Sequence, residues 1–345
     1  MAGLVLRFLQ ARLAFLAVLS LTTALLMAQL SPYFLNADNL LGMTRFGAVL
    51  GLLALGQTLV IISGRGGIDL SIGAMLSLSG VFFGTLATTA ELPIPVAILA
   101  TLAFGLLLGS VNGLLVTVVG IQPIIATLGT FYLYGSLALV WTNGVPISGF
   151  TPEFGMIGQQ ATLGVPNQVL LVLAPVALVL SYVVGHTVFG RSIFLIGINQ
   201  TASALSGLNV AATRVAVYAI SGLVAAMGSI VTASWLLAAR PGAGAGYELQ
   251  SITVVVLGGT AIMGGAGSLA ATLLAVLIVT MIGSGLQLAN FNAIIQLAVL
   301  GILLLSAVVL NQFLLSRRAQ RPPVRPATAG EFSQPAGSDG QALHE

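Results

Sequence analysis

The sequence predicts an all-α, polytopic membrane protein of about ten transmembrane helices, some of them broken or re-entrant. Two observations predict this class. Hydrophobic residues make up 57% of the 345 residues and charged residues only 6%, whereas soluble domains carry about a quarter charged residues. The mean hydropathy is +1.09. A chain of this composition must place most of its apolar surface against lipid.

The individual spans follow from the length of each apolar segment. A helix needs about 20 apolar residues to cross a bilayer, and polar or glycine-rich breaks separate such segments here. The predicted spans are residues 13–30, 42–62, 70–90, 94–119, 122–141, 169–186, 214–238, 249–263, 267–287 and 292–311. The fifth begins at Gln122-Pro123 and the short eighth ends in Gly264-Gly265, so either is a candidate half-helix. Such a break must be buried in protein or line a cavity, because lipid cannot satisfy exposed backbone groups.

The arginines predict the topology. With an uncleaved first span and the N-terminus inside, only Arg45 and Arg240 of the 11 basic residues fall outside. This is a strong positive-inside bias, and it predicts that both termini are cytoplasmic. We also place every ionisable residue near the end of a span or in a loop.

Three non-membrane segments complete the organisation. We expect Thr142 to Gln168 to form an ordered outer loop, and Thr187 to Thr213 to form an inner loop with a short helix from Thr201 to Leu208. Residues 317–345 are rich in Pro, Gly, Ala and Ser and predict a disordered cytoplasmic tail. The membrane domain is thus predicted to span residues 1–316.

Composition also excludes several kinds of chemistry. The chain has no cysteine and no lysine, so it lacks thiolate metal ligands and the lysine of an ATP-binding phosphate loop. His186 and His344 stand alone, which predicts no metal site. If ATP drives this protein, a partner chain binds it, and this chain holds no cofactor. The net charge of +3 comes from the tail and scattered loop arginines, which argues against a nucleic-acid partner.

Four blocks of sequence resemble a known family. They are LALGQTLVIISGRGGIDLSIGAMLSLSGV at 53–81, GSVNGLLVTVVGIQPIIATLGTFYLYGSLALVWTNGVPI at 109–147, GRSIFLIGINQTASALSGLNV at 190–210, and PGAGAGYELQSITVVVLGGTAIMGGAGSLAATLLAVLI at 241–278. Together and in this order they resemble the ribose-type sugar permeases of bacterial ABC importers. The resemblance implies a lipid-embedded inner-membrane permease that carries a monosaccharide or related polyol inward. It also implies a second permease chain, identical or paralogous, a separate ATPase that uses ATP, and a periplasmic sugar-binding protein.

Two departures from the family stand out. Gly64-Arg65 is inserted ahead of Gly66-Gly67, and Gln250 stands where the family usually has Asp after Tyr-Glu-Leu. Both changes fall beside the predicted breaks, so they bear on the shape of the bends and on the cargo rather than on the class of protein.

Two carboxylates lie beside the predicted breaks. Asp69 and Glu248 are each expected to cap the helix that follows, where a carboxylate complements the helix dipole. The functional alternatives are bracing a bend, sensing the ATPase or contacting a partner chain. The residues expected to shape the bends are Gly67, Asp69, Ser71, Glu248, Gly258 and Gly259.

The inner loop and the uncharged polar residues supply the remaining candidates. By resemblance to the family's coupling segment, ATPase contact is expected at Gly190, Arg191, Gly197, Asn199, Ala202, Leu205, Ser206 and Gly207. A sugar needs neutral donors and acceptors, and the candidates along its path are Asn112, Gln122, Thr127 and Asn292. The alternative for each of these four is a hydrogen bond that only joins helices.

Two other functions compete with the permease of an ABC importer. An ion-coupled secondary transporter also uses broken helices and duplicated halves, but it usually needs ionisable groups deep in the membrane. An intramembrane enzyme needs clustered catalytic side chains, and the sequence offers none. Weak echoes of residues 66–73 at 258–265 and of 124–129 at 294–301, with offsets of 192 and 170, hint at related halves.

Overall fold

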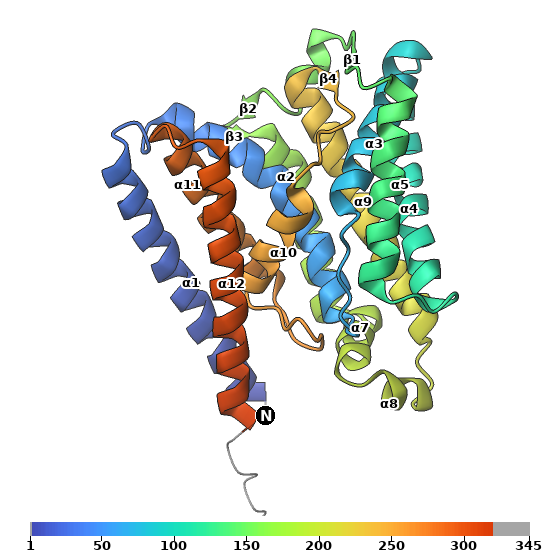
Figure 1. Ribbon diagram of the computed structural model, residues 1–345, viewed down its shortest axis with the longest axis vertical. Helices are drawn as coiled ribbons and strands as arrows, with labels where there is room; N and C mark the ends of the chain where they lie inside the picture. The colour runs from blue at the N-terminus through green and yellow to red at the C-terminus, as the bar shows by residue number, and fades with distance from the viewer. Residues whose placement is uncertain (1, 320–345) are drawn as a thin grey trace, which may run out of the picture.

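The computed structural model describes residues 2–319, with side chains placed from residue 13 to residue 309. Most of these residues are helical, and the long helices form one elongated bundle (Figure 1). In this part of the chain, eight helices are long and apolar enough to cross a membrane. They are α1 (Ala2–Leu30), α2 (Ala37–Ile62), α3 (Ile72–Gly84) with its π-helical continuation η1 (Thr85–Thr89), α4 (Ile94–Thr117), α5 (Pro123–Thr142), α6 (Ala174–His186) with the preceding π-turn η3 (Gln168–Leu173), α9 (Val210–Leu236) and α11 (Leu269–Leu288).

Four further helices complete the described chain: α7 (Val188–Ile198), α8 (Gln200–Leu205), α10 (Tyr247–Leu257) and α12 (Ala293–Ala319). Each of the ten predicted spans contains a helix, so the predicted fold class is confirmed. The eighth span was predicted to be a candidate half-helix, and α10 has only 11 residues. The fifth is not broken, because α5 runs for 20 residues with Pro123 at its first position, where a missing N–H costs no hydrogen bond.

The outer loop is ordered, as predicted. It contains the short strands β1 (Ile147–Ser148), β2 (Ala161–Thr162) and β3 (Val165–Pro166) and the 3₁₀ turn η2 (Pro152–Met156). β1 pairs with β4 (Ala238–Ala239), which follows α9, and β2 pairs with β3. The Gly158 N–H donates to Ser234 Oγ at 2.9 Å, and the Gln159 amide donates to Trp235 O at 2.9 Å. These bonds hold the loop over the end of α9.

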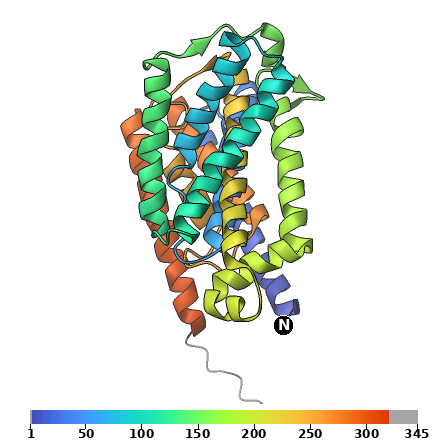
Figure 2. The ribbon, with the colours of Figure 1, turned by 90° about the vertical axis from the view of Figure 1, so that its right-hand side faces the viewer.

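The opposite end of the bundle carries α7 and α8, and the N-terminal end of α1 lies at this same end (Figures 1 and 2). The predicted inner loop is therefore mostly helical. α8 covers residues 200–205, shorter than the predicted 201–208, because the chain turns at Ser206 and at Gly207, whose φ is +84°.

The bundle contains two structural repeats of opposite orientation. The first comprises α2, an extended break, α3, α4 and α5; the second comprises α9, an extended break, α10, α11 and α12. α3 and α10 begin at residues 72 and 247, and α4 and α11 at residues 94 and 269, an offset of 175 in both cases. Arg214 at the start of α9 donates to Gly64 O just beyond the end of α2, so these two helices run in opposite directions.

This offset decides between the two sequence echoes. The echo with offset 170 falls at the starts of α5 and α12, which are corresponding elements. The correspondence suggested by the echo with offset 192 is wrong, because residues 66–73 lead into α3 whereas residues 258–265 follow α10. Inverted repeats of this kind characterise many membrane transporters.

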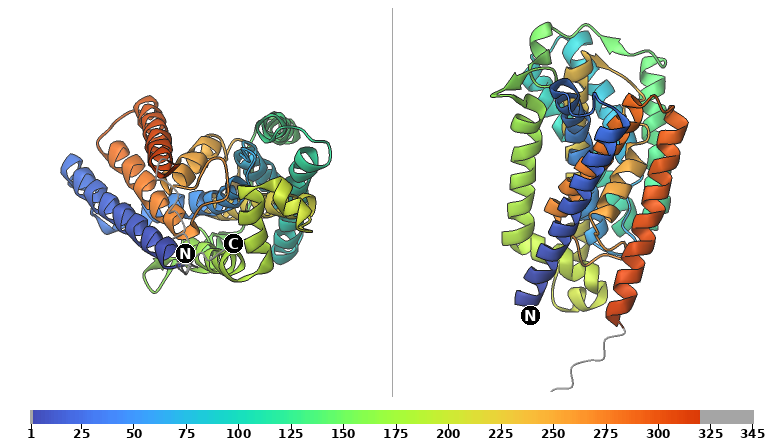
Figure 3. Two further views of the ribbon diagram at one scale, coloured as in Figure 1. Left: turned by 90° about the horizontal axis from the view of Figure 1, so that it is seen from below. Right: turned by 90° about the vertical axis from the view of Figure 1, so that its left-hand side faces the viewer.

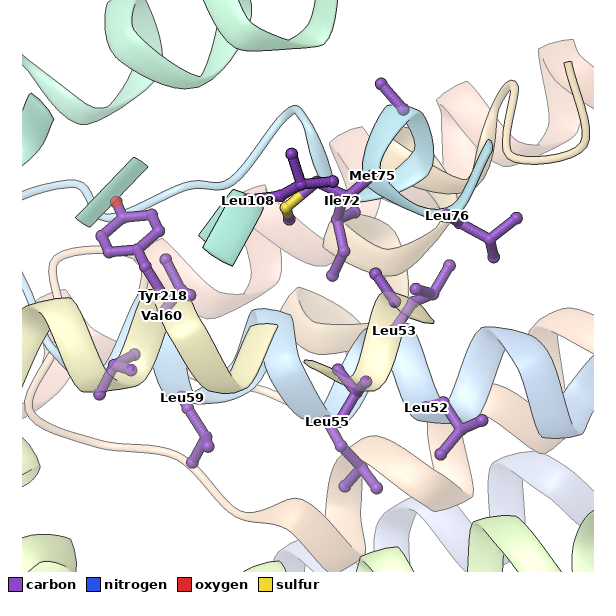
Figure 4. Packing of buried hydrophobic residues seen from close by; sticks show 14 of the residues in the cluster. Leu52, Leu53, Leu55, Leu59, Val60, Ile72, Met75, Leu76, Leu108 and Tyr218 are labelled. Atoms are coloured by element: carbon purple, nitrogen blue, oxygen red, sulfur yellow. The ribbon is translucent and has the colours of Figure 1, made fainter. Parts of the chain in front are cut away.

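α2 and α9 form the centre of the bundle, while α1 lies at its rim. In the apolar windows of these helices, 89% of α2 and 67% of α9 is buried, against 11% of α1. Figure 4 shows Leu52, Leu53, Leu55 and Leu59 of α2 in the core together with Tyr218 of α9. Seen from below, α5 and α12 flank the region that contains α3 and α10 (Figure 3).

The predicted membrane domain, residues 1–316, falls almost entirely within the described chain. Of the predicted tail, residues 317–319 belong to α12, and residues 320–345 lie outside the described residues.

Candidate functional site

The second extended break crosses the start of α3 inside the bundle. At the crossing, the backbone of Gly73 at the start of α3 lies against Gly244 in the break before α10. An ideal Cβ on either glycine would overlap the carbonyl oxygen of the other. The Gly244 N–H also donates to Ser77 Oγ of α3 at 2.9 Å. The start of α3 and the second break, far apart in sequence, therefore meet at one point, and only residues without a side chain fit there.

Neighbouring helices satisfy the backbone of the first break. With its amide oriented to fit both groups, Gln57 of α2 accepts from Asp69 N at 3.1 Å and donates to Asp69 O at 3.2 Å. Thr127 of α5 accepts from Leu70 N at 3.1 Å and lies 3.0 Å from Ile68 O, to which its hydroxyl can donate. These contacts supply the internal hydrogen bonds that a non-helical segment requires at membrane depth.

The carboxylate of Asp69 is completely buried. Its Oδ1 accepts from Ser71 N at 3.0 Å and from Ser71 Oγ at 2.7 Å, and its Oδ2 accepts from Ser221 Oγ at 2.9 Å. The bonds to Ser71 close a turn just before α3, whose N-cap is Ser71 itself, so Asp69 does not cap the helix directly as expected. Ser221, however, lies in the interior of α9. Asp69 lies in the segment between the second and third spans, as predicted, but the nine residues of this break, 63–71, carry it back into the bundle, where a sequence pattern does not place it.

Glu248 lies near the start of the second half-helix, about one turn beyond Gly244, the position that corresponds to Asp69. It lies in the first turn of α10 and accepts from Gly246 N at 3.1 Å through both carboxylate oxygens. An ideal Cβ on Gly73 would lie 2.6 Å from Glu248 Oε2, so this carboxylate lies beside the crossing. Among the other predicted bend residues, Gly67 approaches Val60 O, Gly258 approaches Thr272, and Gly259 has a φ of +73°.

The four path candidates separate into two pairs. Asn112 and Thr127 are fully buried, and Asn112 Nδ2 donates to Ser71 Oγ at 2.7 Å. Both residues thus bind the first break, as the helix-joining alternative requires. Gln122 and Asn292 are exposed and immediately precede α5 and α12. They are 170 positions apart and correspond in the two repeats, so they lie at opposite ends of the bundle.

The coupling candidates also separate. Arg191, Asn199, Ala202, Leu205, Ser206 and Gly207 are exposed at the α7–α8 end, and the Leu205 side chain is 85% exposed. Gly190 and Gly197 instead lie against their own chain. A Cβ on Gly190 would overlap the carbonyls of Val183 and Val184 at the end of α6. These two glycines are therefore not positioned to contact a partner directly.

Sequence reasoning missed the role of Gly197. A Cβ there would overlap Ile62 O, the last carbonyl of α2, and Gly265 N in the turn between α10 and α11. Gly265 N donates to that same Ile62 O at 2.9 Å. Gly64, which opens the first break, packs on Gly197 as well. One backbone junction thus joins the exposed α7–α8 segment to the base of both repeats. Each of these glycines could be noticed in the sequence, but no pattern there pairs them.

The bundle, its inverted repeats and its extended breaks define a polytopic membrane transport protein. The chain belongs to the family described as branched-chain amino acid transport system / permease component, whose model matches residues 39–308. It is 37% identical over 290 residues to the ribose import permease protein RbsC of Escherichia coli strain K12, covering 83% of this chain and 89% of that one. It is 39% identical over 286 residues to RbsC of Bacillus subtilis strain 168, covering 82% and 87%.

A third relative has another named cargo. The autoinducer 2 import system permease protein LsrD of Yersinia enterocolitica is 38% identical over 282 residues, covering 80% of this chain and 84% of that one. No solved structure matches the chain. The family is one of transport permeases, so this chain is a permease subunit rather than an enzyme.

Proposed function

We propose that this permease imports a neutral monosaccharide or related polyol, as the names of the ribose permeases suggest. A partner ATPase uses ATP, a periplasmic binding protein delivers the cargo to the ordered outer loop, and a second permease chain completes the complex. In this arrangement the protein lies in the bacterial inner membrane, and the α7–α8 end and both termini face the cytoplasm.

The exposed α7–α8 segment and its backbone junction carry the proposal. An ATPase docked on Leu205 and its exposed neighbours would push on α7, in which Gly197 is the last residue but one. Gly197 contacts the end of α2 and the turn after α10 without an intervening side chain. A displacement of α7 is therefore transferred to both repeats at once, since no flexible side chain is present to absorb it.

The route of the cargo is proposed along the region flanked by α5 and α12. Gln122 and Asn292 lie at its two ends and offer uncharged donors and acceptors. Asn112 and Thr127 do not contact the cargo in this proposal; they stabilise the first break through their hydrogen bonds. The crossing of Gly73 and Gly244 then lies between the two halves that must move relative to each other.

The ion-coupled alternative lacks support from the comparisons, because the relatives are permeases of import systems. A buried carboxylate such as Asp69 is what such a carrier requires. In this chain, however, three hydrogen bonds occupy that carboxylate. Its role here is to hold the break rather than to exchange ions.

A substitution at the exposed tip of α8 tests ATPase docking. Leu205→Glu places a charge where an apolar contact is proposed, so the ATPase should no longer co-purify with the permease. Leu163→Glu is the matched control, because Leu163 is 95% exposed at the opposite end of the bundle. The docking assignment is wrong if the Leu205 variant retains its ATPase as well as the control does.

A further inference from the structure

A cavity of about 400 Å³ lies between α2 of the first repeat and α10, α11 and α12 of the second, and the proposed route does not use it. Asp38 and Asn39 are among the residues that line it near the start of α2. Its volume falls in the range of about 300–1,000 Å³ that is usual for small-molecule sites.

The cavity lining combines neutral polar groups with apolar and aromatic ones. Within the described residues, the side chains of Tyr247, Gln250 and Gln287 form no hydrogen bond. Phe46 and Leu50 of α2 provide apolar wall. Asp38 is the sole ionisable side chain among the lining residues apart from the phenol of Tyr247. The cavity therefore offers unused donors and acceptors together with an apolar surface.

The helix that corresponds to α11 in the first repeat is α4. The two helices differ in the size of the residues that they pack against their neighbours, and this difference explains why the cavity exists. α4 packs closely on α9 through Gly105, Gly109 and Gly113, whose missing side chains leave backbone against backbone. The positions 175 residues later on α11 are Thr280, Ser284 and Leu288. All three line the cavity, so side chains stand where the first repeat has backbone against backbone, and the Ser284 hydroxyl donates to Asn39 Oδ1 of α2 at 2.6 Å.

The corresponding space in the first repeat is filled. Tyr218 of α9, Leu108 of α4 and Met75 of α3 are buried there (Figure 4). Tyr218 and Met75 are the counterparts, at nearly the same offset, of Met43 and Gln250 in the cavity lining. One scaffold thus occurs twice, closed in one copy and open in the other.

We propose that this cavity binds a small neutral polyhydroxylated molecule, a sugar or polyol, within a single permease chain. Amide and phenol groups pair with hydroxyls as both donor and acceptor, while Phe46 and Leu50 pack against C–H groups. An acyl chain would cover the half-buried Gln250 amide without offering it a hydrogen bond, and a buried polar group without a partner costs about 1–3 kcal/mol on protein-based scales. This inference rests on the proposed import of such a solute.

The cavity lies where a bound molecule would restrain the movement of α10. Tyr247 and Gln250 belong to the first turns of α10, directly after the crossing at Gly244. A bound polyol would contact α10 on one side and α2 and α11 on the other. It would therefore hold the half-helix in the arrangement seen here, and its release would accompany movement of the second break.

Protection of an introduced cysteine tests the site, since the chain has no cysteine of its own. Ser284→Cys is prepared in the full transporter in proteoliposomes and labelled with a methanethiosulfonate reagent. The probe is a mixture of D-ribose, D-xylose, D-glucose and xylitol at high concentration. We expect severalfold slower labelling with the mixture, no protection of a Leu163→Cys control, and loss of protection in Ser284→Cys combined with Gln250→Leu and Gln287→Leu.

Uptake of the same radiolabelled solutes is measured in parallel with the cysteine-free protein. Import of any of them without protection of Ser284→Cys overturns the cavity site and leaves the proposed function standing. Loss of both overturns both. Protection by extracted phospholipid, with none from the polyol mixture, identifies the cavity as a lipid site and also overturns the inference.

Discussion

Gly73 and Gly244 lie backbone against backbone where the second break of the permease crosses the start of α3. They belong to opposite repeats and are the point at which the first turn of α3 meets the segment that leads into α10. No side chain fits between them, so this contact sets how closely the two repeats approach each other.

Adding one methyl group at the crossing should separate the repeats. We expect Gly73→Ala or Gly244→Ala to destabilise the permease by about 1–3 kcal/mol or more, because overpacking of a close-packed contact forces backbone shifts. Thermal unfolding of the purified protein measures this loss. Gly80→Ala is the matched control on α3, because its Cβ would be 3.5 Å from its nearest neighbour, Ser229 Cβ. Equal stability of Gly80→Ala and Gly73→Ala would show that the crossing is not tight.

Removing the hydroxyl that binds Asp69 should destabilise the first break. Ser221→Ala leaves one oxygen of a buried carboxylate without its donor, which we expect to cost about 1–3 kcal/mol. Thermal unfolding again gives the result. The control is Ser229→Ala, two turns further along α9, whose hydroxyl bonds only to its own helix at Ala226 O. If the two variants lose the same stability, the hydrogen bond from Ser221 to Asp69 does not stabilise the first break as predicted.

The topology is testable at two highly exposed leucines. Cysteines placed singly at Leu163 and at Leu205, which are 95% and 85% exposed at opposite ends of the bundle, should react from opposite sides of the membrane. A membrane-impermeant maleimide applied to intact spheroplasts should label only the Leu163 variant. Labelling of Leu205→Cys from outside would reverse the proposed orientation.

The backbone junction at Gly197 should govern coupling. Gly197→Ala introduces a Cβ that overlaps Ile62 O, so we expect α7 to shift and transport per ATP hydrolysed to fall severalfold, while the ATPase still docks. Gly185→Ala in α6 is the control, because its Cβ would meet nothing within 4 Å. The measurement is the ratio of solute imported to ATP hydrolysed in proteoliposomes. A ratio equal to that of the control would rule out transmission through Gly197.

Much of this fold is predictable because the apolar segments are long. A run of about 20 apolar residues has few alternatives to a membrane helix. Each of the ten predicted segments contains a helix, and eight of these helices are long and apolar enough to cross a membrane. The short α10 was marked by its limited length and by the glycines that follow it. Pro123 was the misleading signal, since the first position of a helix accepts proline as readily as a break does.

The site was less predictable, because its contacts join residues far apart in the chain. Asp69 stands beside Ser71 in sequence, which indicates a cap, but its partner Ser221 is 152 residues away. Gly197 was expected to face the ATPase, yet it packs on Ile62 and Gly265. The sequence shows small residues on α4 and larger ones on α11. That these positions correspond to each other becomes visible only from the structural repeat.

The most direct test of the central claim is the energy source of import. The permease, reconstituted in proteoliposomes with its ATPase and binding protein, is supplied with radiolabelled polyols outside and ATP at the ATPase side. An ionophore removes all ion gradients. We predict that uptake continues with ATP and stops when ATP is replaced by a non-hydrolysable analogue. Uptake that stops with the ionophore while ATP is held constant, or that proceeds on an ion gradient without ATP, would contradict the account.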